Sequence, residues 1–135
     1  MTDKQRKILV VDDLPDWRKT LGGLLVDEGY QVQVAPSLAE ALKLLEDNHF
    51  DLAVLDMRLD ETDEDNTDGL KLASKIKECW PSVEVVIITG YQTPETLREA
   101  MEPDSLGARL VADFIPKTQT EDLIRAVKRA LSEHH

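Results

Sequence analysis

The sequence predicts an α/β fold in which a parallel sheet is covered by helices on both faces. Short apolar, β-branched runs alternate with segments whose apolar residues recur at helical spacing, and this alternation occurs five times. Prolines, glycines and capping motifs stand between the segments, as is typical of short connections. Five strands that alternate with five helices predict a parallel sheet. Each crossover helix returns the chain to the end of the sheet at which the preceding strand began, so successive strands run in the same direction.

The five expected strands are short runs rich in β-branched and apolar residues. The second (YQVQVA) alternates between polar and apolar side chains, and the fourth (VEVVII) is the most apolar. Pro116 closes the fifth run, and proline suits an edge strand best because it donates no backbone hydrogen bond. In chain order, the expected strands are residues 8–11, 30–35, 51–55, 83–88 and 110–115.

The five expected helices are identified by apolar spacing together with start and stop signals. Pro15 suits the first turn of the first helix, and capping boxes beginning at Ser37 and Thr118 open the second and the fifth. Gly29 ends the first helix, and Pro103 must end or kink the fourth. In chain order, the expected helices are residues 14–28, 37–48, 69–79, 93–102 and 118–131.

Length, composition and charge restrict the class of protein. A chain of 135 residues with 41% apolar and 32% charged residues is expected to be one soluble globular domain. The net charge of -11 argues against nucleic acid or an anionic membrane as a direct partner, because both repel an acidic protein. No apolar run approaches the length that spans a bilayer, so we expect a cytoplasmic protein. The single cysteine, Cys79, forms no internal disulfide and is expected to be packed within its helix.

Polar residues follow four of the five expected strands. Asp12 and Asp13 follow the first strand, and Asp56 follows the third. Thr89 follows the fourth and Lys117 the fifth. The carboxyl ends of parallel strands meet at one edge of the sheet, where open α/β sheets bind their ligands. We therefore expect three carboxylates, a hydroxyl and an ammonium group to come together there.

This set of side chains favours phosphoryl chemistry with a divalent cation. Neighbouring carboxylates repel one another unless a cation neutralises them, and oxygen ligands without histidine or cysteine favour Mg²⁺. Thr89 and Lys117 add a neutral donor and a point charge for a phosphoryl group. A carboxylate can itself form an aspartyl phosphate, and Asp56 fits that role best because its strand is expected to lie centrally.

Each of these residues has an ordinary alternative when it is taken alone. Asp13 can cap the first helix, Thr89 can be a turn residue and Lys117 can be a solvated surface charge. The phosphoryl-transfer interpretation therefore depends on their convergence at one edge.

Four segments resemble the successive signatures of response-regulator receiver domains in two-component signalling: ILVVDDLPDWRKTL, DLAVLDMRL…DGL, VVIITGY and DFIPK. The resemblance covers about residues 5–132, so we expect residues 1–135 to be a single receiver domain. It implies a flavodoxin-like fold with strand order 2-1-3-4-5. It also implies a phosphorylation switch that receives its phosphoryl group on Asp56 from a histidine kinase or phosphotransfer protein. Such a domain catalyses only its own phosphorylation and dephosphorylation, so it is not expected to be an enzyme acting on other substrates.

The resemblance assigns the ligands of the cation. Asp12, Asp13 and Asp56 are implied to hold Mg²⁺, with Asp13 favoured over Asp12 as a direct ligand. The backbone carbonyl of Arg58 is implied to be a further ligand.

The resemblance also assigns the phosphoryl contacts and the output surface. Thr89 and Lys117 are implied to bind the phosphoryl oxygens, while Thr89 and Phe114 are implied to form the switch. An effector or a second copy is expected to contact the fourth helix, the fifth strand and the fifth helix. The chain departs from the family pattern in an acidic insertion at residues 60–68 and in the absence of a proline after Lys117.

Three alternative interpretations stay open at this point. A pseudo-receiver would keep the fold and bind a partner without phosphotransfer. A haloacid-dehalogenase-type phosphohydrolase also uses an aspartyl phosphate, but the spacing of Asp56 and Asp60 and the strand they follow are both wrong for it. Glu64 begins a segment similar to an EF-hand calcium loop, although Lys75 stands where that loop requires glutamate.

Overall fold

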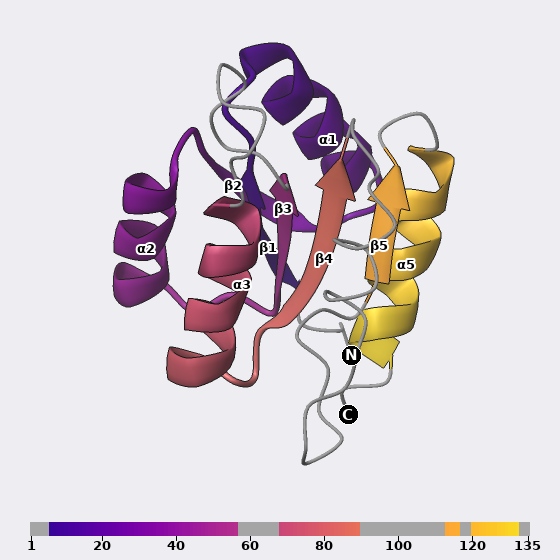
Figure 1. The fold of residues 1–135 in the computed structure, drawn as a ribbon. Helices are drawn as coiled ribbons and strands as arrows, with labels where there is room; N and C mark the ends of the chain where they lie inside the picture. The colour runs from indigo at the N-terminus through magenta and orange to yellow at the C-terminus, as the bar shows by residue number, and fades with distance from the viewer. Residues whose placement is uncertain (1–5, 57–67, 90–112, 117–119, 133–135) are drawn as a thin grey trace.

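The computed structural model is a three-layer α/β fold and describes residues 6–56, 68–89, 113–116 and 120–132 (Figure 1). A central sheet of five parallel strands has the order β2-β1-β3-β4-β5. Helices α1 and α5 cover one face of the sheet, and α2 and α3 cover the other (Figure 1). The expected fold class and strand order are confirmed.

All five expected strands are present, and their bounds differ from the expected ones by one residue at most ends. The strands are β1 (Lys7–Val11), β2 (Gln31–Ala35), β3 (Leu52–Asp56), β4 (Glu84–Thr89) and β5 (Asp113–Pro116). The described helices are α1 (Pro15–Asp27), α2 (Leu38–Asp47), α3 (Asp68–Cys79) and α5 (Glu121–Ser132). The expected fourth helix, residues 93–102, lies outside the described residues.

Each central strand contributes to two hydrophobic layers. Along β1, Ile8 and Val10 pack with α1 and α5, whereas Leu9 and Val11 pack with α2 and α3. Every residue of β3 is buried, since this strand lies in the middle of the sheet. This two-sided burial explains why the central strands β1 and β3 are continuous apolar runs in the sequence. None of the described helices is long and apolar enough to cross a membrane.

The local signals at helix ends are only partly those the sequence predicted. The Ser37 hydroxyl caps α2 by accepting a hydrogen bond from the Glu40 amide at 3.3 Å, as expected. The N-cap of α1 is Leu14, which makes no side-chain cap, so the interpretation of Asp13 as a helix cap is wrong. Cys79 is exposed rather than packed, because the following Trp80 packs against the α2–α3 layer instead.

One ion pair joins the ends of α1 and α5. Lys128 on α5 lies 2.9 Å from the carboxylate of Glu28, which directly follows α1. The hydrogen bond from Lys128 to Glu28, reinforced by the negative charge of Glu28, raises the pKa of Lys128. Tyr30 lies beside this pair, and burial raises the pKa of its hydroxyl.

A separate charged group lies at the end of the sheet where the strands begin. Asp51 directly precedes β3 and accepts a hydrogen bond from the Lys7 amide at 2.9 Å. Its other carboxylate oxygen lies 3.7 Å from Arg6 and 3.5 Å from His49. His49 therefore lies at the edge opposite to the carboxyl ends of the strands.

Candidate metal and phosphoryl site

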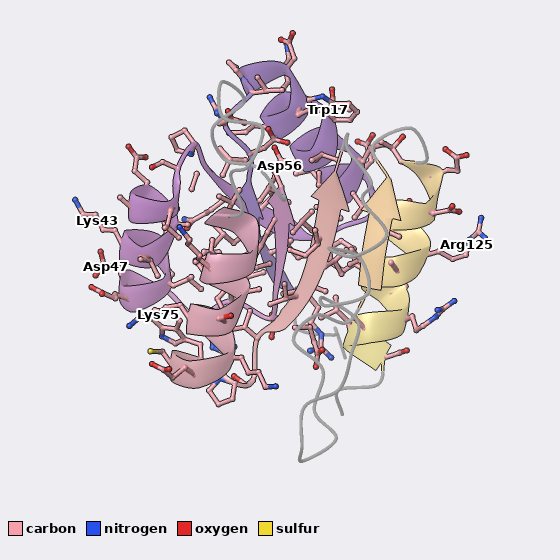
Figure 2. The ribbon with its side chains drawn as sticks, viewed as in Figure 1. Trp17, Lys43, Asp47, Asp56, Lys75 and Arg125 are labelled. Carbon is pink, nitrogen blue, oxygen red and sulfur yellow. The ribbon has the colours of Figure 1, made fainter. Side chains whose placement is uncertain are left out.

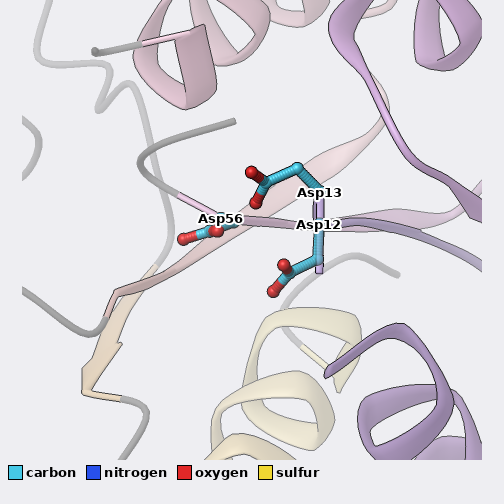
Figure 3. A group of neighbouring side chains, drawn as sticks. All are labelled: Asp12, Asp13 and Asp56. Carbon is cyan, nitrogen blue, oxygen red and sulfur yellow. The ribbon is translucent and has the colours of Figure 1, made fainter. Parts of the chain in front are cut away.

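Three aspartates meet where β1 and β3 end. The two strands are paired in parallel with Val11 opposite Leu55, so Asp12 and Asp56 continue the same register. One carboxylate oxygen from each of Asp12, Asp13 and Asp56 lies within 4.8 Å of the others. The carboxylates of Asp12 and Asp13 extend to the side on which Asp56 lies (Figure 3). Parallel strands that end at one edge thus produce a compact group of acids.

Burial makes this group electrostatically costly. Asp12 is 0% exposed and Asp56 is 2% exposed, while Asp13 is partly exposed. Two carboxylates about 4–5 Å apart repel each other by roughly 3–4 kcal/mol at an effective dielectric constant of about 20. Burial also removes the water that would screen and solvate them. A cation bound among these carboxylates would offset the repulsion.

The donor set fits Mg²⁺. It consists of oxygen atoms alone, and no histidine or cysteine belongs to the cluster found among the described residues. Hard oxygen ligands at one open edge are the ligands that Mg²⁺ takes when it also binds phosphate. Asp56 lies at the carboxyl end of the central strand β3 (Figure 2).

Asp12 is held in place by hydrogen bonds from three directions. Its amide donates to the Ala35 carbonyl at 3.2 Å, and its Oδ1 atom accepts from the Leu14 amide at 2.9 Å. Its carbonyl accepts from Nη1 of Arg18 at 2.8 Å. The sequence interpretation missed Arg18, although it lies in the DDLPDWR segment, five residues after the acidic pair.

Thr89 and Phe114 occupy defined backbone positions near the same edge. Ile88 of β4 pairs with Asp56, and Thr89 is the next and last residue of β4. On β5, Phe114 pairs with Ile87, and Pro116 pairs with Thr89. Only the backbone positions of Thr89 and Phe114 belong to the described structure.

The remaining predicted site residues lie outside the described part of the chain. These are Arg58 and Lys117, together with residues 60–67 of the acidic insertion. Asp68, the last residue of that insertion, begins α3. Because Asp68 to Lys75 are helical, they do not form the second half of an EF-hand loop, which argues further against the calcium interpretation.

Comparison with known proteins gives consistent matches over nearly the whole chain. The family model of the response regulator receiver domain matches residues 8–128. The transcriptional regulatory protein GlrR of Escherichia coli (strain K12) is 34% identical over 136 residues, which cover 98% of this chain and 28% of that protein. The chain spans only 24% to 28% of the length of the curated relatives compared with it.

Solved structures show the same similarity. A response regulator receiver domain protein (CheY-like) from Methanospirillum hungatei JF-1 has a TM-score of 0.80 and 28% identity, with 97% of each chain covered. The response regulator TrrA of Thermotoga maritima, solved in complex with Mg²⁺-BeF, has a TM-score of 0.75 and 26% identity. That match covers 94% of this chain and 100% of TrrA. Together with the family match and the aspartate group at the strand ends, these similarities show that the chain belongs to the response regulator receiver domain family.

Proposed function

We propose that residues 1–135 form a single receiver domain that accepts a phosphoryl group on Asp56 in a Mg²⁺-dependent reaction and thereby acts as a signalling switch. The observation that carries this proposal is the meeting of Asp12, Asp13 and Asp56, whose ligand oxygens lie within 4.8 Å of one another. Membership of the receiver family supports it. The complex of TrrA with Mg²⁺-BeF supports the metal assignment.

Four residues would hold the cation. Asp12, Asp13 and Asp56 supply carboxylate oxygens, and Arg58 supplies its backbone carbonyl. When bound, Mg²⁺ neutralises the carboxylates and offers coordination positions to phosphoryl oxygens. Asp13 is the better candidate than Asp12 for a direct ligand, because Oδ1 of Asp12 already accepts a hydrogen bond from Leu14.

Asp56 supplies the nucleophile. One of its oxygens forms a bond to phosphorus while the bond from phosphorus to the imidazole nitrogen of the donor breaks, and that nitrogen keeps the electron pair. Its position on the central strand β3 supports this role, since β1 with the acidic pair lies on one side and β4 with Thr89 on the other. Chemically, the donor is a phosphohistidine of a histidine kinase or phosphotransfer protein.

Thr89 and Lys117 bind the phosphoryl oxygens in this proposal. Thr89 ends the strand next to Asp56, and Lys117 directly follows Pro116, which pairs with Thr89. The hydroxyl donates a neutral hydrogen bond, and the ammonium group supplies positive charge opposite the developing negative charge. With these groups the domain catalyses only its own phosphorylation and dephosphorylation.

The output is a change of packing at the β4–β5 side of the sheet. A phosphoryl oxygen draws the Thr89 hydroxyl inward, and the ring of Phe114 moves into the space that Thr89 leaves. The parallel pairing of Phe114 with Ile87, two residues before Thr89, supports this coupling. The altered surface, made by the fourth helix, β5 and α5, contacts an effector or a second copy of the chain, so the signal is a population shift.

A mass measurement tests the reaction. The chain is incubated with a small acyl phosphate and Mg²⁺, and we expect one phosphoryl group in the wild type and none in Asp56→Asn. Asp47→Asn is the matched control, because Asp47 extends from α2 into solvent, whereas Asp56 lies at the end of the central strand (Figure 2). Removal of Mg²⁺ with a chelator also prevents the reaction.

The same measurement separates the alternatives. An unmodified wild-type chain that still binds its partner would support a pseudo-receiver. Continuous release of phosphate from a phosphate ester, without a lasting adduct, would support a phosphohydrolase. Phosphorylation of Asp56→Asn at the wild-type rate would show that another residue is the acceptor.

A further inference from the structure

We propose that Arg18 is a positioning residue for the metal centre. Its guanidinium group holds the backbone carbonyl of Asp12 and so fixes the turn that directs Asp12 and Asp13 toward Asp56. This inference rests on the proposed binding of Mg²⁺ by the three aspartates. It adds a residue outside the acidic cluster, and a titration can measure whether that residue strengthens or weakens Mg²⁺ binding.

The contact of Arg18 joins the start of α1 to the residue that directly follows β1. Arg18 lies in the first turn of α1, where its amide donates to the Leu14 carbonyl at 3.1 Å. Its side chain extends back across the helix start, and Nη1 donates to the Asp12 carbonyl at 2.8 Å. Two side-chain hydrogen bonds therefore tie the start of α1 to the end of β1, this one and the bond from the Leu14 amide to Oδ1 of Asp12.

Three hydrogen bonds together fix the orientation of Asp12. The amide of Asp12 is held by Ala35 of β2, its carbonyl by Arg18 of α1, and its Oδ1 by the amide of Leu14. Removal of the Arg18 bond leaves the Asp12–Asp13 peptide less firmly held, because the carbonyl of Asp12 belongs to that peptide. Rotation there moves the Asp13 carboxylate, which is only partly buried and is the favoured direct ligand.

The charge of Arg18 and its positioning role predict opposite effects on the affinity of the site for Mg²⁺. A guanidinium group beside the cluster repels a divalent cation, so its charge alone weakens Mg²⁺ binding, and this effect is reduced by salt. Its hydrogen bond orients the ligands before the cation arrives, which strengthens binding and depends little on salt. Groups that hold metal ligands in place typically change metal affinity by about 10-fold to 100-fold. We infer that positioning is the larger effect.

The experiment is a Mg²⁺ titration by calorimetry at low and high ionic strength. Arg18→Ala is expected to weaken Mg²⁺ binding by about 10-fold at both ionic strengths. Arg18→Lys is expected to recover part of the loss, because an ammonium group donates to the same carbonyl without the planar fork. Lys19→Ala is the matched control: it removes the same charge from the next residue of α1, which is exposed. It should leave Mg²⁺ binding unchanged or slightly tighter at low salt, with no difference at high salt.

A second readout does not depend on the cation. In the metal-free protein, the amide chemical shifts of residues 12–14 are expected to change in Arg18→Ala and to stay near wild type in Lys19→Ala. This measurement also establishes that both variants are folded. If Arg18→Ala does not fold, Arg18→Lys provides the decisive comparison, with weaker Mg²⁺ binding than wild type expected.

The outcomes distinguish this inference from the proposed function. If the wild type binds Mg²⁺ and a folded Arg18→Ala binds it equally well or more tightly, the positioning role is wrong and the metal site stands. Where Arg18→Ala does not fold, equal or tighter binding by Arg18→Lys has the same meaning. If the wild type binds no Mg²⁺, the proposed metal site is itself wrong, and the inference about Arg18 falls with it.

Discussion

The two ends of β3 carry aspartates in opposite electrostatic surroundings. Asp51 precedes the strand, accepts a hydrogen bond from the Lys7 amide and lies 3.7 Å from Arg6 and 3.5 Å from His49. Asp56 ends the strand and, among the described residues, forms a group with two further acids, Asp12 and Asp13. An acid that only stabilises the fold is thus balanced by the chain itself. An acid balanced by a bound cation, as proposed for Asp56, would be available for chemistry with a phosphoryl group.

Solvent exposure sharpens this difference. The Asp51 side chain is 22% exposed, so water completes its solvation, whereas Asp56 is 2% exposed. Crowded, buried carboxylates are costly unless positive charge offsets them, and such groups are typical of functional sites. The two ends of one strand therefore provide an internal comparison for experiments.

The largest expected effect concerns phosphorylation. Asp56→Asn is expected to abolish the adduct, because an amide is a poor nucleophile and a weak ligand for Mg²⁺. Asp51→Asn is expected to accept a phosphoryl group as the wild type does, since it lies at the opposite edge of the sheet. Mass spectrometry after incubation with an acyl phosphate measures both. Loss of the adduct in a folded Asp51→Asn protein would contradict the separation of the two edges.

The next effect is stabilisation by Mg²⁺. At a concentration about 100 times its dissociation constant, a ligand that binds only the folded state raises the free energy of unfolding by about 2.7 kcal/mol. Asp13→Asn is expected to lose most of this gain, and Asp51→Asn to keep it. Urea denaturation with and without Mg²⁺ measures the difference. If Mg²⁺ stabilised the wild type, Asp13→Asn and Asp51→Asn equally, the cation would bind at another site.

A smaller effect is expected for stability without metal. Asp56→Asn removes one charge from a repelling group and is expected to raise the free energy of unfolding by about 1–3 kcal/mol. Asp51→Asn weakens a charged hydrogen bond and an ion pair, and is expected to lower it by about 1 kcal/mol. Denaturation in the presence of a chelator tests whether the two substitutions change the free energy of unfolding in opposite directions. Destabilisation by both substitutions would mean that the acidic cluster is balanced by the chain itself.

The smallest expected effect on stability concerns the ion pair of Lys128 with Glu28. Like Asp51, Glu28 is an acid paired with a positive side chain of the protein itself. The folded-state pKa of Lys128 is raised above its ordinary value of 10.5, so the ion pair stabilises the protein below that pH. This contribution is lost as the pH rises through the raised folded-state pKa. The free energies of unfolding of wild type and Lys128→Met should therefore converge above pH 10.5, the ordinary value. A difference that stays constant with pH would indicate that only the packing of the lysine stem matters.

Particular residues illustrate how far the sequence can be interpreted. The strands were predictable because a strand buried on both faces is a continuous apolar run, as in β1 and β3. The convergence of Asp12, Asp13 and Asp56 was predictable because parallel strands end at the same edge. The residue roles assigned by resemblance at Arg58, Thr89, Phe114 and Lys117 stay predictions.

Other features were decided by tertiary contacts. The sequence left open a helix cap at Asp13 as the alternative to a metal ligand, yet Leu14 is the N-cap and its amide donates to the Asp12 carboxylate. Cys79 was expected to be packed, but Trp80 takes the contact with the α2–α3 layer. Helical spacing defines a face only approximately at the last residue of a helix, so it does not distinguish these two side chains.

The sequence by itself determined the class of fold, the order of its elements and the edge at which the acids gather, since periodicity and strand direction are local properties of the chain. The tertiary structure alone decided which polar atoms meet. The 2.8 Å contact of Arg18 with the Asp12 carbonyl and the grouping of Asp51 with Arg6 and His49 are examples. The physical reason is that a side-chain hydrogen bond depends on distance and angle to within fractions of an ångström, which packing fixes and sequence spacing does not.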